Sequence, residues 1–128
     1  MKEELITFET AKLAKEKGFN GKCYKMCDPM GNIIHDTYTD YGVNYNSNEG
    51  KHKDMYSLPN QSLLQKWLRE KHKIHVVADV NDTLSWVYTI QMLYKAKYKT
   101  QVIANSSYKT YEKALEAGLQ SALKMINL

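Results

Sequence analysis

Apolar residues recur at helical spacing in three stretches of the chain, 7–18, 60–72 and 110–126. Each stretch begins with a threonine or asparagine, whose side chain can accept a hydrogen bond from the first turn of a helix. The residues that share an apolar face are Phe8, Ala11, Leu13 and Ala14 in the first stretch, Leu63, Leu64, Trp67 and Leu68 in the second, and Tyr111, Ala114, Leu115, Gly118, Leu119, Ala122, Leu123 and Ile126 in the third. The pattern predicts three amphipathic helices, the first ending at Gly18 with Phe19 as its hydrophobic closing contact.

A period-two pattern, which is typical of strands, is clearest over 84–94. The alternate positions that share one face there are Leu84, Trp86, Tyr88, Ile90, Met92 and Tyr94. The stretch 74–80 before it and the stretch 98–106 after it also alternate, so the three predict an antiparallel meander. Earlier in the chain, 21–41 reads as two strands around the tight turn "DPMGN".

These elements predict one α+β domain over 1–128, in the order helix, hairpin, helix, three-stranded antiparallel meander, helix. We expect the helices to pack on one face of the sheet. The residues expected to be largely buried in a single core are Trp67, Trp86, Ile90, Leu115 and Leu119. The segment 42–58 is polar and rich in Asn, Gly and Lys, which predicts a mobile loop without apolar anchors.

Composition places the chain among ordinary globular proteins, with 43% hydrophobic and 25% charged residues. The opening stretch 1–18 is charged throughout, unlike a signal peptide. No apolar run approaches the roughly 18 residues that a membrane-spanning helix needs. We therefore expect a cytoplasmic protein that does not act at a membrane.

Three blocks of the chain, "MKEELITFETAKLAKEKGFN", "PNQSLLQKWLREKHKIHV" and "TYEKALEAGLQSALKMI", resemble in sequence and order a family of small proteins. That family recurs in gut bacteria and in their phages and mobile elements, and it has no established activity. The resemblance covers about half of the chain and leaves out the segment from Lys22 to Leu58. It implies a bacterial or phage protein of the cytoplasm, and it implies no activity, cofactor or site residue.

The sequence contains no glycine-rich phosphate loop, nucleophile elbow or HExxH motif. Asp79 and Asp82 flank a turn, where they can hold a cation or act as acid and base, but aspartates beside turns are usually turn formers. Cys27, next to Asp28, can form a thiol–imidazole pair with His35 across the hairpin, although a third orienting group is not evident. We expect no catalytic residue, cofactor or metal.

The two cysteines, Cys23 and Cys27, are four residues apart in "CYKMC". On one strand they lie about 13 Å apart, too far for a disulfide, and tight ligand pairs typical of structural zinc are missing. We expect both thiols to be reduced and metal-free.

The net charge of +4 comes from 18 basic and 14 acidic residues, and Arg69 is the one arginine. Lysines and tyrosines are mixed over 94–100, where a hairpin tip can track phosphates and stack on bases. The residues concerned are Tyr94, Lys95, Lys97, Tyr98 and Lys99. The alternative is a solvated hairpin whose lysines discourage edge-to-edge pairing. Because arginine supplies the fork that reads guanine, one arginine weakens the nucleic-acid hypothesis.

The face of the second strand opposite the aromatic residues is half apolar. Its residues are Val87, Thr89, Gln91 and Leu93. A face of this kind is typical of an interface with another protein or with a second copy of the same chain. We therefore predict a non-enzymatic binding or adaptor protein that acts through protein–protein contacts or self-association. Nucleic-acid binding through 94–100 is the alternative.

Overall fold

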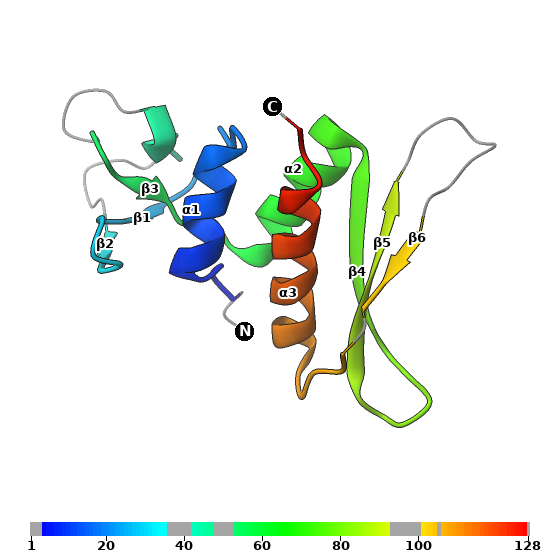
Figure 1. The fold of residues 1–128 in the computed structure, drawn as a ribbon. Helices are drawn as coiled ribbons and strands as arrows, with labels where there is room; N and C mark the ends of the chain where they lie inside the picture. The colour runs from blue at the N-terminus through cyan, green and yellow to red at the C-terminus, as the bar shows by residue number, and fades with distance from the viewer. Residues whose placement is uncertain (1–3, 36–41, 48–52, 93–100, 105, 128) are drawn as a thin grey trace. The chain divides into compact units, whose positions relative to one another are not determined.

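The computed structural model describes residues 4–35, 42–47, 53–92, 101–104 and 106–127. Its elements, in chain order, are α1 (Phe8–Glu16), β1 (Lys25–Cys27), β2 (Ile33–His35), η1 (Tyr45–Ser47), β3 (Tyr56–Ser57), α2 (Gln61–His72), β4 (Ile74–Val80), β5 (Trp86–Met92), β6 (Gln101–Ile103) and α3 (Tyr111–Lys124). The α+β class and the predicted order of helices and strands are confirmed, with β3 as an additional short strand (Figure 1).

The chain divides into two compact units, Met1–Leu63 and Leu64–Leu128, and each contains its own antiparallel sheet. The strand order is β2-β1-β3 in the first unit and β4-β5-β6 in the second. Helix α2 begins in the first unit and continues into the second. The single domain expected over 1–128 stays a prediction.

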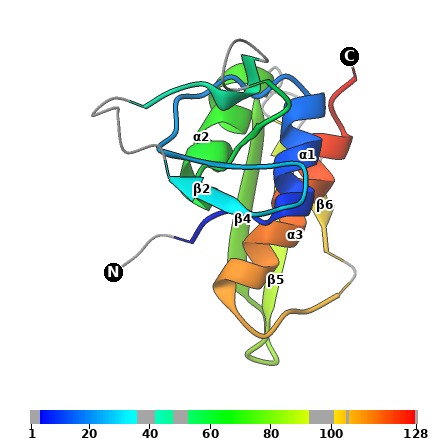
Figure 2. The ribbon, with the colours of Figure 1, turned by 90° about the vertical axis from the view of Figure 1, so that its left-hand side faces the viewer.

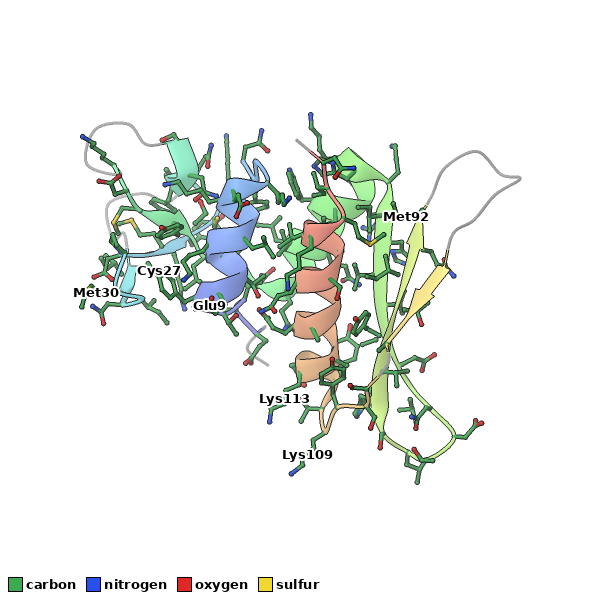
Figure 3. All side chains as sticks on the ribbon, in the orientation of Figure 1. Glu9, Cys27, Met30, Met92, Lys109 and Lys113 are labelled. Atoms are coloured by element: carbon green, nitrogen blue, oxygen red, sulfur yellow. The ribbon has the colours of Figure 1, made fainter. Side chains whose placement is uncertain are left out.

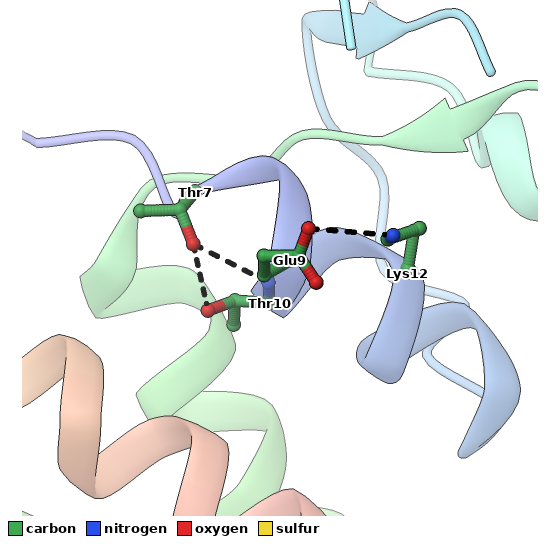
Figure 4. A network of polar contacts seen from close by, with 4 residues as sticks. All are labelled: Thr7, Glu9, Thr10 and Lys12. Atoms are coloured by element: carbon green, nitrogen blue, oxygen red, sulfur yellow. Dashed lines mark hydrogen bonds and ion pairs between the residues drawn. The ribbon is translucent and has the colours of Figure 1, made fainter. Parts of the chain in front are cut away.

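Helix α1 begins and ends as its sequence predicts. Thr7 Oγ1 accepts a hydrogen bond from the Thr10 N–H (3.3 Å), and Lys12 Nζ lies 3.4 Å from Glu9 Oε1 on the first turns (Figure 4). At the other end the Phe19 N–H donates to the Ala14 carbonyl (2.9 Å), which is the long bond of a Schellman ending.

The first unit holds its helix and sheet together partly through Lys15. Its Nζ donates to the Met55 carbonyl (2.7 Å) and lies 5.0 Å from the centre of the Tyr56 ring. Burial lowers the pKa of Lys15, and the opposing effect of Asp54 is smaller. The lysine therefore ties α1 to the chain entering β3.

The segment 42–58, expected to lack apolar anchors, contains several, so that part of the prediction was wrong. Tyr45 in η1 is fully buried and Leu58 is 3% exposed. The Tyr45 N–H donates to Ser57 Oγ (2.9 Å), and the Ser57 N–H donates to Asn46 Oδ1 (2.8 Å). The side-chain oxygens of Ser57 and Asn46 thus anchor a segment whose sequence shows no periodic pattern. Residues 48–52 lie outside the described part.

In the second unit β5 is the central strand of the predicted meander. Its register with β4 pairs Val76 with Ile90, and its register with β6 pairs Ile90 with Val102. Helices α2 and α3 lie on the same side of this sheet, and α3 runs along β4 and β5 (Figures 1 and 2). Of the expected core, Ile90, Leu115 and Leu119 are buried, whereas Trp67 and Trp86 are partly exposed, contrary to prediction.

Helix α3 approaches the sheet closely at Gly118. A Cβ placed there would lie 2.7 Å from Val76 Cγ1 and 2.9 Å from Tyr88 Cβ. Next to this point the Tyr88 hydroxyl and Ser121 Oγ share a hydrogen bond of 2.9 Å. A glycine in the middle of a helix costs stability, and here it permits contact between backbone and sheet.

Candidate functional site

The face of the second sheet that lies opposite α3 carries the predicted interface residues Val87, Thr89 and Gln91. Their cross-strand neighbours on β4 are Asp79, Val77 and His75, respectively. The side chains of the five residues other than Asp79 are partly exposed. No described helix of the second unit covers this face (Figures 1 and 2). We call it the outer sheet face; the fourth predicted residue, Leu93, lies outside the described residues.

Among the described residues, no strand pairs with the outer edge of β4. Trp86 exchanges two backbone hydrogen bonds with Tyr108, so alternate residues of β5 from Trp86 onward bond away from β4. By the register, the backbone groups of Val76 and Val80 then point away from β5 as well. Gln65 Nε2 from α2 donates to the Val76 carbonyl (2.6 Å), so α2 satisfies part of this edge.

At the far end of the same edge, the Asp79 carboxylate satisfies the backbone N–H of the next residue. Its Oδ1 accepts a hydrogen bond from the Val80 N–H (2.8 Å). Asp79 itself lies within β4, paired with Val87, and the hydrogen bonds of the turn that follows involve other residues. Within the described residues, no group of three or more His, Cys, Asp or Glu is placed to hold a metal ion.

The turn between β4 and β5 is built around Asn81. Asn81 Oδ1 accepts hydrogen bonds from the N–H groups of Thr83 and Ser85 (3.0 Å each), and the Asn81 carbonyl accepts from the Leu84 N–H (3.1 Å). Leu84, which the sequence pattern placed within the strand, instead has a left-handed backbone with φ +62°. A left-handed conformation costs a leucine about 1–2 kcal/mol.

The same hydrogen-bond scheme occurs in the turn between β1 and β2. Asp28 Oδ1 accepts hydrogen bonds from the N–H groups of Met30 and Asn32 (2.9 Å each), and the Asp28 carbonyl accepts from the Gly31 N–H (2.9 Å). Gly31 has φ +88° and occupies the position that Leu84 occupies in the other turn. The two turns therefore differ in the residue at their left-handed position.

Several large apolar side chains of the described residues are exposed near the β4–β5 turn. Leu84 is 84% exposed, Val80 is 43% exposed and Tyr111 is 39% exposed. Val80 lies opposite Trp86, whose ring meets the Tyr111 ring edge to face at 5.6 Å. We call these four residues the turn-end cluster. The cluster was not predicted, although its members lie in the predicted strands and on the predicted apolar face of the last helix.

Charged side chains of both signs surround the turn-end cluster. They are Asp79, Asp82, Lys109 and Lys113, and all four are exposed. The two lysines lie at the start of α3, at the same end of the unit as the turn (Figure 3). None of the four forms an ion pair within the described part of the chain.

The two thiols are in environments that suppress reactivity. Burial raises the pKa of Cys23 to about 11, and hydrogen bonds from Ser57 and Leu58 offset this only in part. Burial, followed by the charge of Asp28, raises the pKa of Cys27 to about 11. Because the thiolate is the nucleophile, these shifts oppose the proposed thiol–imidazole chemistry. The side chain of its other member, His35, is not described.

Two histidines flank the junction of α2 and β4. Burial, followed by the charge of Lys71, lowers the pKa of His72, and burial followed by the charge of Arg69 lowers the pKa of His75. His75 Nδ1 is shielded from solvent without a hydrogen-bond partner in the described structure. Burial and the neighbouring positive charges therefore both favour the neutral imidazole in His72 and His75.

The lysine-rich hairpin 94–100, the predicted nucleic-acid contact, lies outside the described residues. None of the described helices combines the length and apolar composition needed to cross a membrane. Comparison of the chain with protein-family models, curated proteins and solved structures finds no match. The resemblance to a phage-associated family and the cytoplasmic location therefore stay predictions.

Proposed function

We propose that this chain is a non-enzymatic binding protein that self-associates through the outer sheet face. The observation that supports the proposal is that α2 and α3 lie on one side of the β4-β5-β6 sheet, while the opposite side carries partly exposed Val77, Val87 and Thr89. A sheet face of this kind can be covered by the same face of a second copy, as in a two-layer sandwich.

The composition of the outer sheet face suits such a contact. Its two inner rows pair His75 with Gln91 and Val77 with Thr89. These rows carry no formal charge when His75 is neutral, in a chain of which 25% is charged. Depletion of charge is typical of the centre of protein interfaces.

The size of the face sets the expected affinity. Strands β4 and β5 have seven residues each and β6 has three. At about 3.3 Å per residue and about 4.7 Å between strands, the face covers roughly 260 Å² per copy. Specific stable interfaces bury about 800 Å² per partner. The outer sheet face alone therefore predicts weak, concentration-dependent association.

Sedimentation equilibrium over a wide range of protein concentration tests the proposal. Replacing Thr89, at the centre of the face, with lysine places a charge in the contact, so we expect Thr89→Lys to weaken association at least about tenfold. Thr89→Val keeps the shape of the side chain and should keep the association. Asn127→Lys adds the same charge at an exposed position near the end of α3 and should have no effect.

A native chain that sediments as a monomer at every concentration would refute the proposal. So would a Thr89→Lys variant that associates as well as the native protein. The alternative function, nucleic-acid binding through 94–100, predicts salt-dependent binding of a fluorescent duplex, with log affinity falling by about 0.9 per neutralised phosphate for each unit of log salt. Tight binding of this kind by a monomeric chain would favour the alternative.

A further inference from the structure

The β4–β5 turn carries a residue that its own geometry does not favour. In the turn of the same design between β1 and β2, the left-handed position is occupied by Gly31, whereas here it is occupied by Leu84. A side chain at such a position strains the backbone, and glycine or asparagine avoids most of that strain. The requirements of the turn therefore do not explain the leucine.

Packing within the described structure does not explain it either. The Leu84 side chain is 84% exposed, so it gains little from burial. A position that breaks a local rule without a compensating internal contact is a candidate for function. Leu84 is both strained and exposed at the tip of a regular hairpin, which suits a contact with another molecule.

Leu84 and the residues around it supply both a protruding side chain and an apolar surface against which such a side chain packs. Leu84 protrudes at the turn, while Val80, Trp86 and Tyr111 form a partly exposed apolar surface next to it. The charges around them are two acidic and two basic side chains: Asp79, Asp82, Lys109 and Lys113. This end of the unit is complementary to itself in charge as well as in apolar character.

We propose that the turn-end cluster is a second self-association contact, in which two copies meet across a two-fold axis. Leu84 of each copy packs against Val80 and Tyr111 of the other, and the acidic turn of each copy faces the lysines at the start of the other copy's α3. A two-fold contact requires one surface that complements itself, and this surface does. A different partner protein, if it were basic or purely apolar, would leave the charges of at least one sign at this end of the unit without opposite charges.

The contact deepens the proposed function, because the outer sheet face by itself is too small for a stable assembly. Since the turn-end cluster includes Trp86 and Tyr111 from the opposite side of the sheet, the apolar residues of the two contacts do not overlap, and Asp79 borders both. A chain with two separate two-fold contacts forms species larger than a dimer. Loss of either contact leaves a dimer, and loss of both leaves a monomer.

The test uses Leu84→Asn, measured by sedimentation equilibrium in the native chain and in the Thr89→Lys background. Asparagine tolerates the left-handed backbone, so the melting temperature should stay equal or rise. In the Thr89→Lys background, where the turn contact alone remains, we expect dimerisation to weaken at least about 100-fold. The turn contact buries Leu84 of both copies, and the burial of each leucine contributes roughly a factor of ten or more.

Two controls separate contact from folding. Leu84→Met keeps an apolar side chain and should keep the association. Met30→Asn removes a side chain of the same 84% exposure from the turn in the other unit and should change nothing. If Thr89→Lys alone yields a monomer, the turn contact is refuted and the proposed function stands. If Leu84→Asn abolishes all association and Thr89→Lys has no effect, the reverse holds, and a monomeric native chain refutes both.

Discussion

Replacing Gly118 with alanine sets two effects of known size against each other. Alanine is favoured over glycine in a helix interior by about 1 kcal/mol, so an unobstructed Gly118→Ala would stabilise α3. The added Cβ, however, would lie 2.7 Å from Val76 Cγ1 and 2.9 Å from Tyr88 Cβ. Real Cβ atoms essentially never come within 3.0 Å of such neighbours, so α3 or the sheet must move.

Neither neighbour can yield easily. Val76 is fully buried in β4, and the Tyr88 atom concerned is next to the backbone of the central strand. The Tyr88 hydroxyl is also held to Ser121 on α3. Overpacking of a core costs typically 1–3 kcal/mol. We expect the cost to exceed the gain, with a net loss of about 0.5–2 kcal/mol in the free energy of unfolding.

Urea unfolding followed by circular dichroism measures this difference. Ala117→Gly, at the neighbouring helical position, gives the propensity term separately and should cost about 1 kcal/mol. The free-energy cost of the clash is then the stability lost in Ala117→Gly minus the stability gained in Gly118→Ala. If Gly118→Ala stabilises the chain by the full amount that Ala117→Gly loses, α3 does not approach the sheet as closely as described.

Two further predictions concern titratable groups. With pKa values of about 11, Cys23 and Cys27 should stay unlabelled by iodoacetamide at pH 7.5 in the folded chain and react after unfolding; rapid labelling of the native protein would contradict their burial. His72 and His75 have pKa values below the ordinary 6.5 when folded, so the unfolded chain binds protons more readily. Stability should therefore be full above pH 6.5 and fall as the pH drops through this value, and a double His→Gln variant should lose that part of the slope.

The features that the sequence predicted correctly are those that depend on neighbours along the chain. The N-cap at Thr7 and the closing contact of Phe19 act within one or two turns of α1. The alternation of β4 and β5 follows from burial of one face under α3. Local hydrogen bonds and periodic burial leave a direct trace in the order of residues.

The features that sequence analysis missed depend on a side chain that interrupts a pattern. The alternation of apolar residues begins at Leu84, but Thr83 and Ser85 donate hydrogen bonds to Asn81 Oδ1 and keep this stretch in a turn, so β5 starts at Trp86. The signal was present, since "NDTLS" has an asparagine at the same position as the aspartate of "DPMGN". Tyr45 was missed for a different reason, because its anchor Ser57 lies 12 residues away in a segment without periodicity.

The pairing of Leu5 with Asn60 has a consequence for the order in which the chain folds during synthesis. The Ile6 N–H donates to the Pro59 carbonyl (3.0 Å) and the Gln61 N–H donates to the Glu4 carbonyl (2.8 Å), so the first unit is closed by its two ends. Bringing together chain ends about 55 residues apart costs roughly 3–4 kcal/mol of loop entropy. The strands β4 and β5, by contrast, are joined by a short turn, and such local contacts form fast. The half of the chain that leaves the ribosome first is therefore expected to wait for residue 61 before it can close.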